Sequence, residues 1–275
     1  MSDTKSSGKM PRKLDLTPED TKMITDYIQS NPADLLQIPT LRAKLAESRF
    51  KRLDPAALEV WGESGDAIRA HAIEHNLNNL RQMQALERPS ILVYALRSIE
   101  YIVRNVAELT VLTIGPRTES ELFSLIAAGF TPDHITGLDL ISYSDFVQVG
   151  DVHAMPFEDN SFDVVIMGWV LPYSADNQKA ANELLRVAKP GAHIAVGCPT
   201  QPLSIPESAQ AETVVGGIPV KSDDGTKTVS SFFNSEQILR LFEGHIDTVI
   251  QRQDPHPAMA HERSNVTAVF RLASE

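Results

Sequence analysis

The sequence cannot form an internal disulfide, because Cys198 is the single cysteine among its 275 residues. A chain of this length can bury a full hydrophobic core without such cross-links. A lack of disulfides is typical of proteins from reducing compartments. We therefore expect a cytoplasmic protein.

Long apolar runs are also missing, since no stretch approaches the roughly 18 apolar residues of a membrane-spanning helix. The first 13 residues are small and polar, without the apolar segment of a secretory signal. We expect residues 1–13 to be disordered, and we expect no membrane partner.

Positive charge is in deficit, because 25 Lys and Arg residues face 36 Asp and Glu residues, a net charge of −11. Such a surface repels a phosphate backbone on average, so nucleic acid is not an expected partner. One basic cluster is interpreted as a solvated helix face. Its members are Arg42, Lys44, Arg49, Lys51 and Arg52.

Several catalytic motifs are absent. The sequence has no Gly-x-Ser-x-Gly nucleophile elbow and no Gly-Lys-Ser/Thr phosphate-binding run. His71, Glu74 and His75 match the H-x-x-E-H pattern of some zinc peptidases. Five helical residues match such a pattern easily by chance, and no third ligand follows, so we expect no metal site.

Helical patterns dominate the first part of the chain. Thr17, Pro18 and Asp20 form a capping pattern that predicts a helix start. Apolar residues then recur at helical spacing. Further helices are expected at residues 32–50, 66–87 and 90–105. Residues 14–108 therefore predict an added helical N-terminal module, whose surplus apolar stripes are also candidates for a homodimer contact.

The pattern changes at residue 110, where short apolar runs begin to alternate with helices. The expected strands are 111–115, 135–139, 146–149, 162–168, 192–197, 245–251 and 265–272. Alternating strands and helices predict an α/β, doubly wound, mostly parallel sheet over residues 109–275. The last two strands predict a C-terminal antiparallel hairpin, and the Pro- and Gly-containing residues 201–230 predict a loop-rich insertion.

Two motifs carry a family resemblance. Residues 150–163 read GDVHAMPFEDNSFD and residues 183–192 read ELLRVAKPGA. In order and spacing they resemble class I S-adenosylmethionine-dependent methyltransferases that act on small molecules. The resemblance implies a Rossmann-like methyltransferase sheet, S-adenosylmethionine as the cofactor and a small-molecule acceptor, which the motifs do not specify.

The resemblance also implies a cofactor site at the carboxyl ends of the strands. Gly115 would let the backbone approach the ligand. Asp139 would accept hydrogen bonds from the ribose hydroxyls, and Asp151, with the Val152 backbone, would bind the adenine. The other cofactor candidates are Pro116, Arg117, Leu140, Met167, Gly168 and Trp169. Candidate catalytic residues, weaker in their support, are Tyr173 and His256.

One departure from the family concerns its Gly-x-Gly-x-Gly loop, which reads Gly115-Pro116-Arg117-Thr118-Glu119 here. Thr118 and Glu121 predict a capping box that starts a helix without any ligand. Arg117, in contrast, is suited to pair with the carboxylate of the cofactor. Two readings stay open: a methyltransferase, or a pseudo-methyltransferase kept for binding, scaffolding or regulation.

The second departure is a short connection. Only eleven residues separate Asp139 from Asp151. A parallel crossover that contains a helix needs about a dozen or more residues. We therefore expect the helix beside the adenine pocket to be missing, which leaves the cofactor site wider or open.

Overall fold

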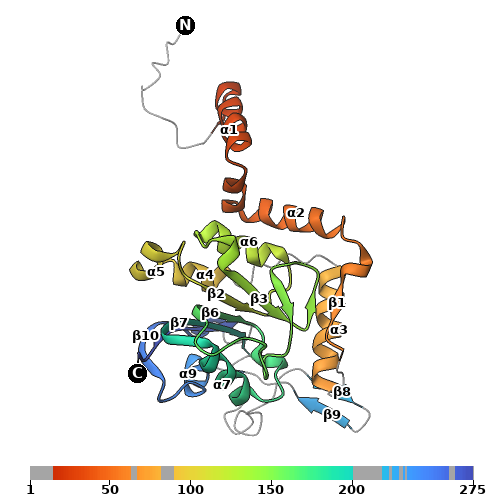
Figure 1. The fold of residues 1–275 in the computed structure, drawn as a ribbon, viewed down its shortest axis with the longest axis vertical. Helices are drawn as coiled ribbons and strands as arrows, with labels where there is room; N and C mark the ends of the chain where they lie inside the picture. The colour runs from red at the N-terminus through yellow and green to blue at the C-terminus, as the bar shows by residue number, and fades with distance from the viewer. Residues whose placement is uncertain are drawn as a thin grey trace.

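The computed structural model describes residues 15–62, 67–81, 90–200, 219–222, 225–228, 232, 234–259 and 264–274. Its centre is a seven-stranded sheet with the order β10-β11-β7-β6-β2-β3-β5 (Figure 1). The strands are β2 (Val111–Ile114), β3 (Ile135–Asp139), β5 (Val147–Val149), β6 (Phe162–Gly168), β7 (Ala188–Pro199), β10 (Ile246–Gln253) and β11 (Asn265–Leu272). The predicted α/β class is confirmed.

Strand direction follows the prediction. The five neighbouring strands β7, β6, β2, β3 and β5 pair in parallel. Strand β11 runs antiparallel to β7, and β10 runs antiparallel to β11. The expected closing hairpin is therefore present. Strand β2 lies between β3 and β6, so the topology reverses at β2, and ligands of such sheets bind at this point.

Helices cover both faces of the sheet (Figure 1). They are α4 (Ser90–Leu96), α5 (Glu100–Asn105), α6 (Glu119–Ala128), α7 (Asn177–Val187) and α9 (Ser235–Arg240). Leu112 and Ile114 of β2 pack with residues of α7 and α9, while Val111 packs with residues of α4 and α6. This alternation explains why every residue of β2 is buried, as in other parallel strands.

The N-terminal part contains α1 (Pro18–Ser30), η1 (Pro32–Gln37), α2 (Pro39–Phe50), η2 (Pro55–Ala57) and α3 (Ala67–Arg81). The capping box of Thr17 and Asp20 is confirmed. The helix expected at 32–50 is divided, because Ile38 before Pro39 adopts extended backbone. The helix expected at 90–105 is also divided, where the Ser98 hydroxyl donates to the Ala95 carbonyl.

Short strands occur where none were expected. Strand β1 (Glu59–Val60) pairs antiparallel with β4 (Ile141–Ser142), so the segment before residue 109 is not entirely helical. Strands β8 (Pro219–Ser222) and β9 (Gly225–Thr228) form a small antiparallel sheet within 201–230, a range that we expected to be loop. The rest of that range, apart from these two strands, and residues 1–13 lie outside the described residues.

The basic cluster is less solvated than the sequence suggests. Arg42 is only 3% exposed, and it donates to the Leu36 carbonyl. Arg49 forms two hydrogen bonds with the carboxylate of Glu119. Arg42 therefore links α2 to η1 within the N-terminal segment, and Arg49 links α2 to α6. None of the helices in the described ranges has the length and apolar character to cross a membrane.

Candidate functional site

A pocket lies at the carboxyl ends of β2, β3 and β6, where the topology reverses, and holds about 720 Å³ of space that includes its opening to solvent. Its position at the switch point of the sheet is where ligands of such folds bind. Predicted cofactor residues in its lining are Gly115, Arg117, Asp139, Leu140, Asp151, Val152, Gly168 and Trp169. Tyr173 also lines the pocket. Met167 and Pro116 are buried beside it, and His256 is exposed in the loop after β10.

Glycine is required at position 115 for two reasons. Its φ is +76°, and an added Cβ would lie 2.4 Å from the Cγ2 atom of Val170. The first glycine of the family loop therefore keeps the chain close to the end of β6.

We expect Gly115→Ala to destabilise the protein by about 2–3 kcal/mol, because strain at positive φ adds to the contact with Val170. Gly244→Ala is the matched control: φ at Gly244 is +83°, yet nothing lies within 4 Å of an added Cβ. Urea unfolding of both variants measures the difference. Equal losses of stability would show that the Val170 contact does not matter.

Glu119, which stands where the family has a glycine, now serves the packing of α6. Glu119 is 3% exposed; its carboxylate accepts from Arg49 at 2.6 and 3.0 Å and from the Ser144 hydroxyl at 2.8 Å. The Glu119 N–H donates to the Tyr143 hydroxyl at 3.1 Å. Burial raises the pKa of Tyr143 above its ordinary value. A buried, paired carboxylate at this position anchors α6 to α2 and to the β4–β5 connection.

The predicted capping box at this helix is wrong. Thr118 is the N-cap residue of α6, but its side chain makes no capping hydrogen bond. The Glu121 carboxylate instead accepts from the Arg117 N–H at 3.3 Å. The side chain that was expected to close the helix start therefore holds the backbone of the loop that faces the pocket.

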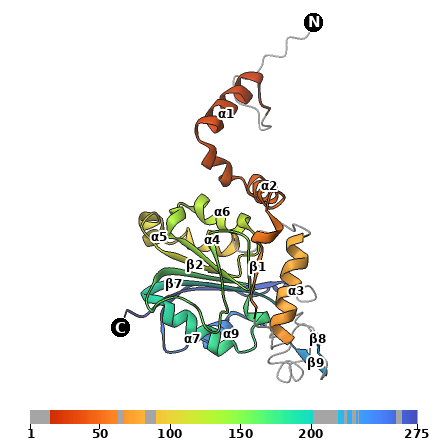
Figure 2. The ribbon, with the colours of Figure 1, turned by 45° about the vertical axis from the view of Figure 1, so that its right-hand side comes forward.

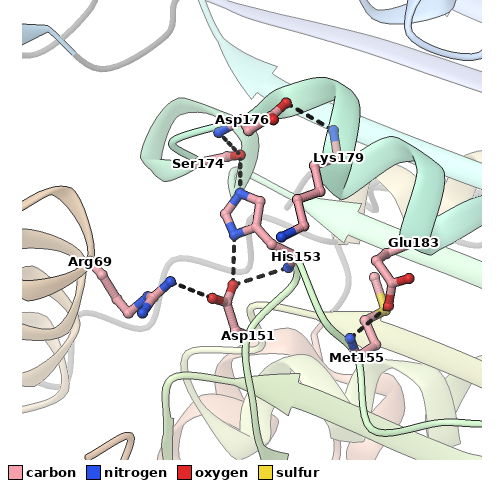
Figure 3. Close-up of polar contacts among 8 residues, drawn as sticks. All are labelled: Arg69, Asp151, His153, Met155, Ser174, Asp176, Lys179 and Glu183. Carbon is pink, nitrogen blue, oxygen red and sulfur yellow. Dashed lines mark hydrogen bonds and ion pairs between the residues drawn. The ribbon is translucent and has the colours of Figure 1, made fainter. Parts of the chain in front are cut away.

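The two carboxylates at the strand ends contact α3. Asp139 Oδ1 accepts from Asn76 Nδ2 at 3.2 Å. Asp151 Oδ2 forms a 2.6 Å ion pair with Arg69 Nη2, which Figure 3 shows reaching from the helix toward the loop. Arg69 and Asn76 are seven residues apart on one helical face, and both line the pocket. Neither residue was among the predicted site residues, because the face between them carries the apolar Ala72 and Ile73.

His153 links Asp151 to the loop after β6. Its Nδ1 lies 2.7 Å from Asp151 Oδ1, and its Nε2 lies 2.7 Å from the Ser174 hydroxyl (Figure 3). The His153 N–H also donates to Asp151 at 3.0 Å. Burial alone would raise the pKa of Asp151, but the bonds from His153 and the charge of Arg69 outweigh it and lower this pKa to about 2. Asp151 is therefore ionised at neutral pH.

The two family motifs support each other in the structure. The Glu183 carboxylate accepts from the Met155 N–H at 2.8 Å. Arg186 donates to the carbonyls of Met155 and Phe157 at 2.9 and 2.8 Å. Helix α7 thus fixes the loop that carries Asp151, which gives a physical reason for the pairing of these motifs.

The short connection after Asp139 has the expected consequence in one respect. No helix lies between β3 and β5; β4 does, and the Leu140 carbonyl accepts from the Trp61 N–H at 2.8 Å. Ile141 packs with Ile73 and Leu80 of α3, which lies beside this end of the sheet (Figures 1 and 2). Arg69, Ala72 and Asn76 of α3 line the pocket on this side.

Arg117 and Tyr173 meet a histidine of α3. Arg117 Nη2 lies 3.4 Å and Tyr173 Oη 3.2 Å from His75 Nε2. An arginine can only donate, so His75 accepts at Nε2 and carries its proton on Nδ1. The rings of His71 and His75 stack on the ring of Tyr173, with centroid distances of 6.3 and 5.2 Å.

Trp169 has an unusual backbone at the end of β6. Its φ is +60°, which is uncommon for a bulky residue. The indole Nε1 donates to Asn265 Oδ1 at 3.1 Å, and the Trp169 N–H donates to the Gly197 carbonyl at 2.7 Å. These contacts with the neighbouring strands hold the indole in the pocket wall, and such strain is frequent at functional sites.

Comparison with known proteins agrees with this geometry. Residues 115–196 match the sequence model of the methyltransferase domain family. Over these residues the chain is similar to methyltransferase domains. The match begins at Gly115, directly after β2, and ends within β7, so it includes the pocket residues of β3 and β6 and both sequence motifs.

Two curated relatives are similar to parts of this chain. The demethylmenaquinone methyltransferase of Renibacterium salmoninarum is 31% identical over 99 residues, which are 36% of this chain and 41% of that protein. The malonyl-[acyl-carrier protein] O-methyltransferase of Erwinia billingiae is 33% identical over 72 residues, 22% of this chain and 29% of the relative. The chain thus matches less than half of the length of either relative.

One solved structure aligns with part of this chain. The S-adenosylmethionine-dependent methyltransferase from Methanosarcina mazei aligns with 64% of this chain and 98% of its own, with a TM-score of 0.44 and 15% sequence identity.

Proposed function

We propose that this protein transfers a methyl group from S-adenosylmethionine to a small molecule. The observation that carries the proposal is the position of Asp139 and Asp151. Both carboxylates lie in one pocket at the switch point of the sheet, within the segment that matches the methyltransferase domain. Acidic groups at such strand ends are suited to bind the hydroxyl and amino groups of a nucleoside.

The residues present fit this cofactor. Asp139 is 6% exposed and now accepts from an amide N–H; the ribose hydroxyls offer donors of the same kind. Asp151, with a depressed pKa, is an anion that can accept from the adenine amino group. Leu138 and Leu140 provide apolar walls, and Arg117 supplies a cation for the methionyl carboxylate.

Helix α3 takes part in this function as a partner of both carboxylates. Asn76 occupies a lone pair of Asp139 that ribose would use, so cofactor binding displaces or shares this bond. Arg69 neutralises part of the charge of Asp151. A carboxylate accepts several hydrogen bonds, so the Arg69 pair and an adenine amino group can coexist on Asp151.

The bound cofactor supplies an activated methyl group. The chain contributes orientation and exclusion of water, which are its main levers in a direct transfer. Trp169 and Tyr173 form the wall beyond β6, where an acceptor would lie, with His75 next to the Tyr173 hydroxyl. The names of the two relatives give different acceptors, demethylmenaquinone and malonyl-[acyl-carrier protein]. We therefore infer that the shared motifs serve the cofactor and that other residues select the acceptor.

Calorimetry tests the proposal. We expect S-adenosylmethionine and its demethylated product to bind the full-length protein, and Asp139→Asn to weaken both about ten- to hundredfold through loss of charge-assisted hydrogen bonds. Asp133→Asn is the matched control, because Asp133 is exposed and lies just before β3, at the end of the strand away from Asp139. Absence of heat and of any thermal shift with the wild type at millimolar cofactor would contradict the proposal and favour a pseudo-methyltransferase.

A further inference from the structure

Helix α1 has an apolar face that the described parts of the chain leave uncovered. It contains no buried residue. Met23, Ile24 and Tyr27 share one face and are 62%, 43% and 54% exposed. Figures 1 and 2 both show this helix standing away from the sheet. A helix of 13 residues without tertiary packing is marginal in water, so this face needs a partner.

Helix α2 has a second stripe of the same kind. Its inner face packs against α6, where Ala46 lies in a cluster with Phe123. Beside this face, Ile38, which precedes the helix, and Leu41 and Leu45 follow one another at helical spacing and are 46%, 37% and 40% exposed. A surface helix normally presents polar residues to solvent. Helix α2 therefore offers an exposed apolar contact surface in addition to the face that packs against α6.

The two helices have opposite charge. The segment Pro18–Ser30 contains three carboxylates and one lysine. In α2, Arg42 and Arg49 are bound to Leu36 and to Glu119, but Lys44 and, directly after the helix, Lys51 and Arg52 are exposed cations. An acidic amphipathic helix and a basic one, each with an exposed apolar stripe, are complementary surfaces. Within one chain they are joined through η1, which lies between Pro32 and Pro39 and from which α1 extends away from α2 (Figure 1).

We propose that this protein forms a homodimer in which α1 of each copy lies along α2 of the other. Two equal contacts then form about a two-fold axis, as in most small oligomers. Each contact buries the stripe of Met23, Ile24 and Tyr27 against that of Ile38, Leu41 and Leu45. A second copy of the chain is the occupant that these surfaces favour, because each chain carries both the α1 surface and the complementary α2 surface.

Light scattering and sedimentation of the full-length protein test this directly. We expect twice the 30.3 kDa mass of one chain at high micromolar concentration. Met23→Glu/Tyr27→Glu should reduce the mass to that of one chain. Tyr94→Glu/Val103→Glu is the control, since these side chains on α4 and α5 are 55% and 54% exposed; it should remain dimeric. A wild-type mass of 30.3 kDa, or a particle that contains another protein, would overturn the proposal.

Charge reversal distinguishes the exchanged arrangement from other dimers. Glu19→Lys/Asp26→Lys places cations on both helices, and Lys44→Glu/Arg52→Glu places acids on both. Each variant alone should be monomeric because both of its α1–α2 contacts repel. An equimolar mixture should restore a heterodimer, since both contacts are then complementary. A dimer in which α1 pairs with α1 would persist in the first variant alone, and that result would contradict our arrangement.

Discussion

Asp151→Asn is expected to reduce the free energy of unfolding by about 2 kcal/mol at neutral pH. The pKa of Asp151 is about 2 in the folded protein against an ordinary 3.8, and this difference corresponds to roughly that stability. The folded state favours the carboxylate, so the stabilisation is fully present above about pH 4. It is lost progressively as the pH falls toward 2.

Urea unfolding of the wild type and Asp151→Asn between pH 3 and pH 7 measures this effect. The two curves should approach each other toward pH 3, because the Asp151 carboxyl of the unfolded chain then binds a proton more readily than that of the folded protein. Asp133→Asn, at an exposed position, should track the wild type throughout. A difference between wild type and Asp151→Asn that is constant over this range would mean that the charge of Asp151 contributes nothing. The same variant should bind S-adenosylmethionine more weakly, as the proposed function requires.

Arg49→Met is expected to cost about 2–3 kcal/mol of stability, because it leaves the Glu119 carboxylate buried without its counter-charge. Methionine keeps an apolar stem against Phe123, over which the guanidinium of Arg49 lies. The chain offers a close control in Lys51. Both cations lie 2.6 Å from a carboxylate, but Glu119 is 3% exposed and Glu47, the partner of Lys51, is 37% exposed.

We therefore expect Lys51→Met to change stability by less than about 0.5 kcal/mol. Adding Glu119→Gln to Arg49→Met should recover part of the loss, since the orphaned charge is then removed. Thermal unfolding of the four variants, including Glu119→Gln alone, completes a double-mutant cycle. Equal losses for Arg49→Met and Lys51→Met would mean that burial of Glu119 does not strengthen its ion pair.

Much of the fold was predictable because its signals are local. The strands of the sheet are recognisable as short apolar runs. Gly129 ends α6 in the left-handed conformation that glycine adopts readily. The boundaries that failed, at Ile38 and near Ser98, are places where one residue changes the backbone within an otherwise helical pattern. A pattern read over many residues averages such single positions away.

The candidate site was predictable on one side. Parallel strands place their carboxyl ends at one edge, so residues 115, 139 and 151 were expected together, and all three line the pocket. The opposite wall was not predictable. Arg69 contacts a residue 82 positions away, and Asn76 one 63 positions away. Nothing in the residues around Arg69 or Asn76 indicates which distant carboxylate each will meet.

The sequence by itself determined the order of strands and helices, the ends of most of them and the edge of the sheet where the carboxylates gather. Tertiary structure alone decided what those carboxylates and the altered glycine loop contact. The Glu121 carboxylate accepts from the Arg117 N–H instead of forming a capping box, and the Glu119 carboxylate pairs with Arg49. Such choices depend on burial, because a charge removed from water takes whichever partner the packing brings near it.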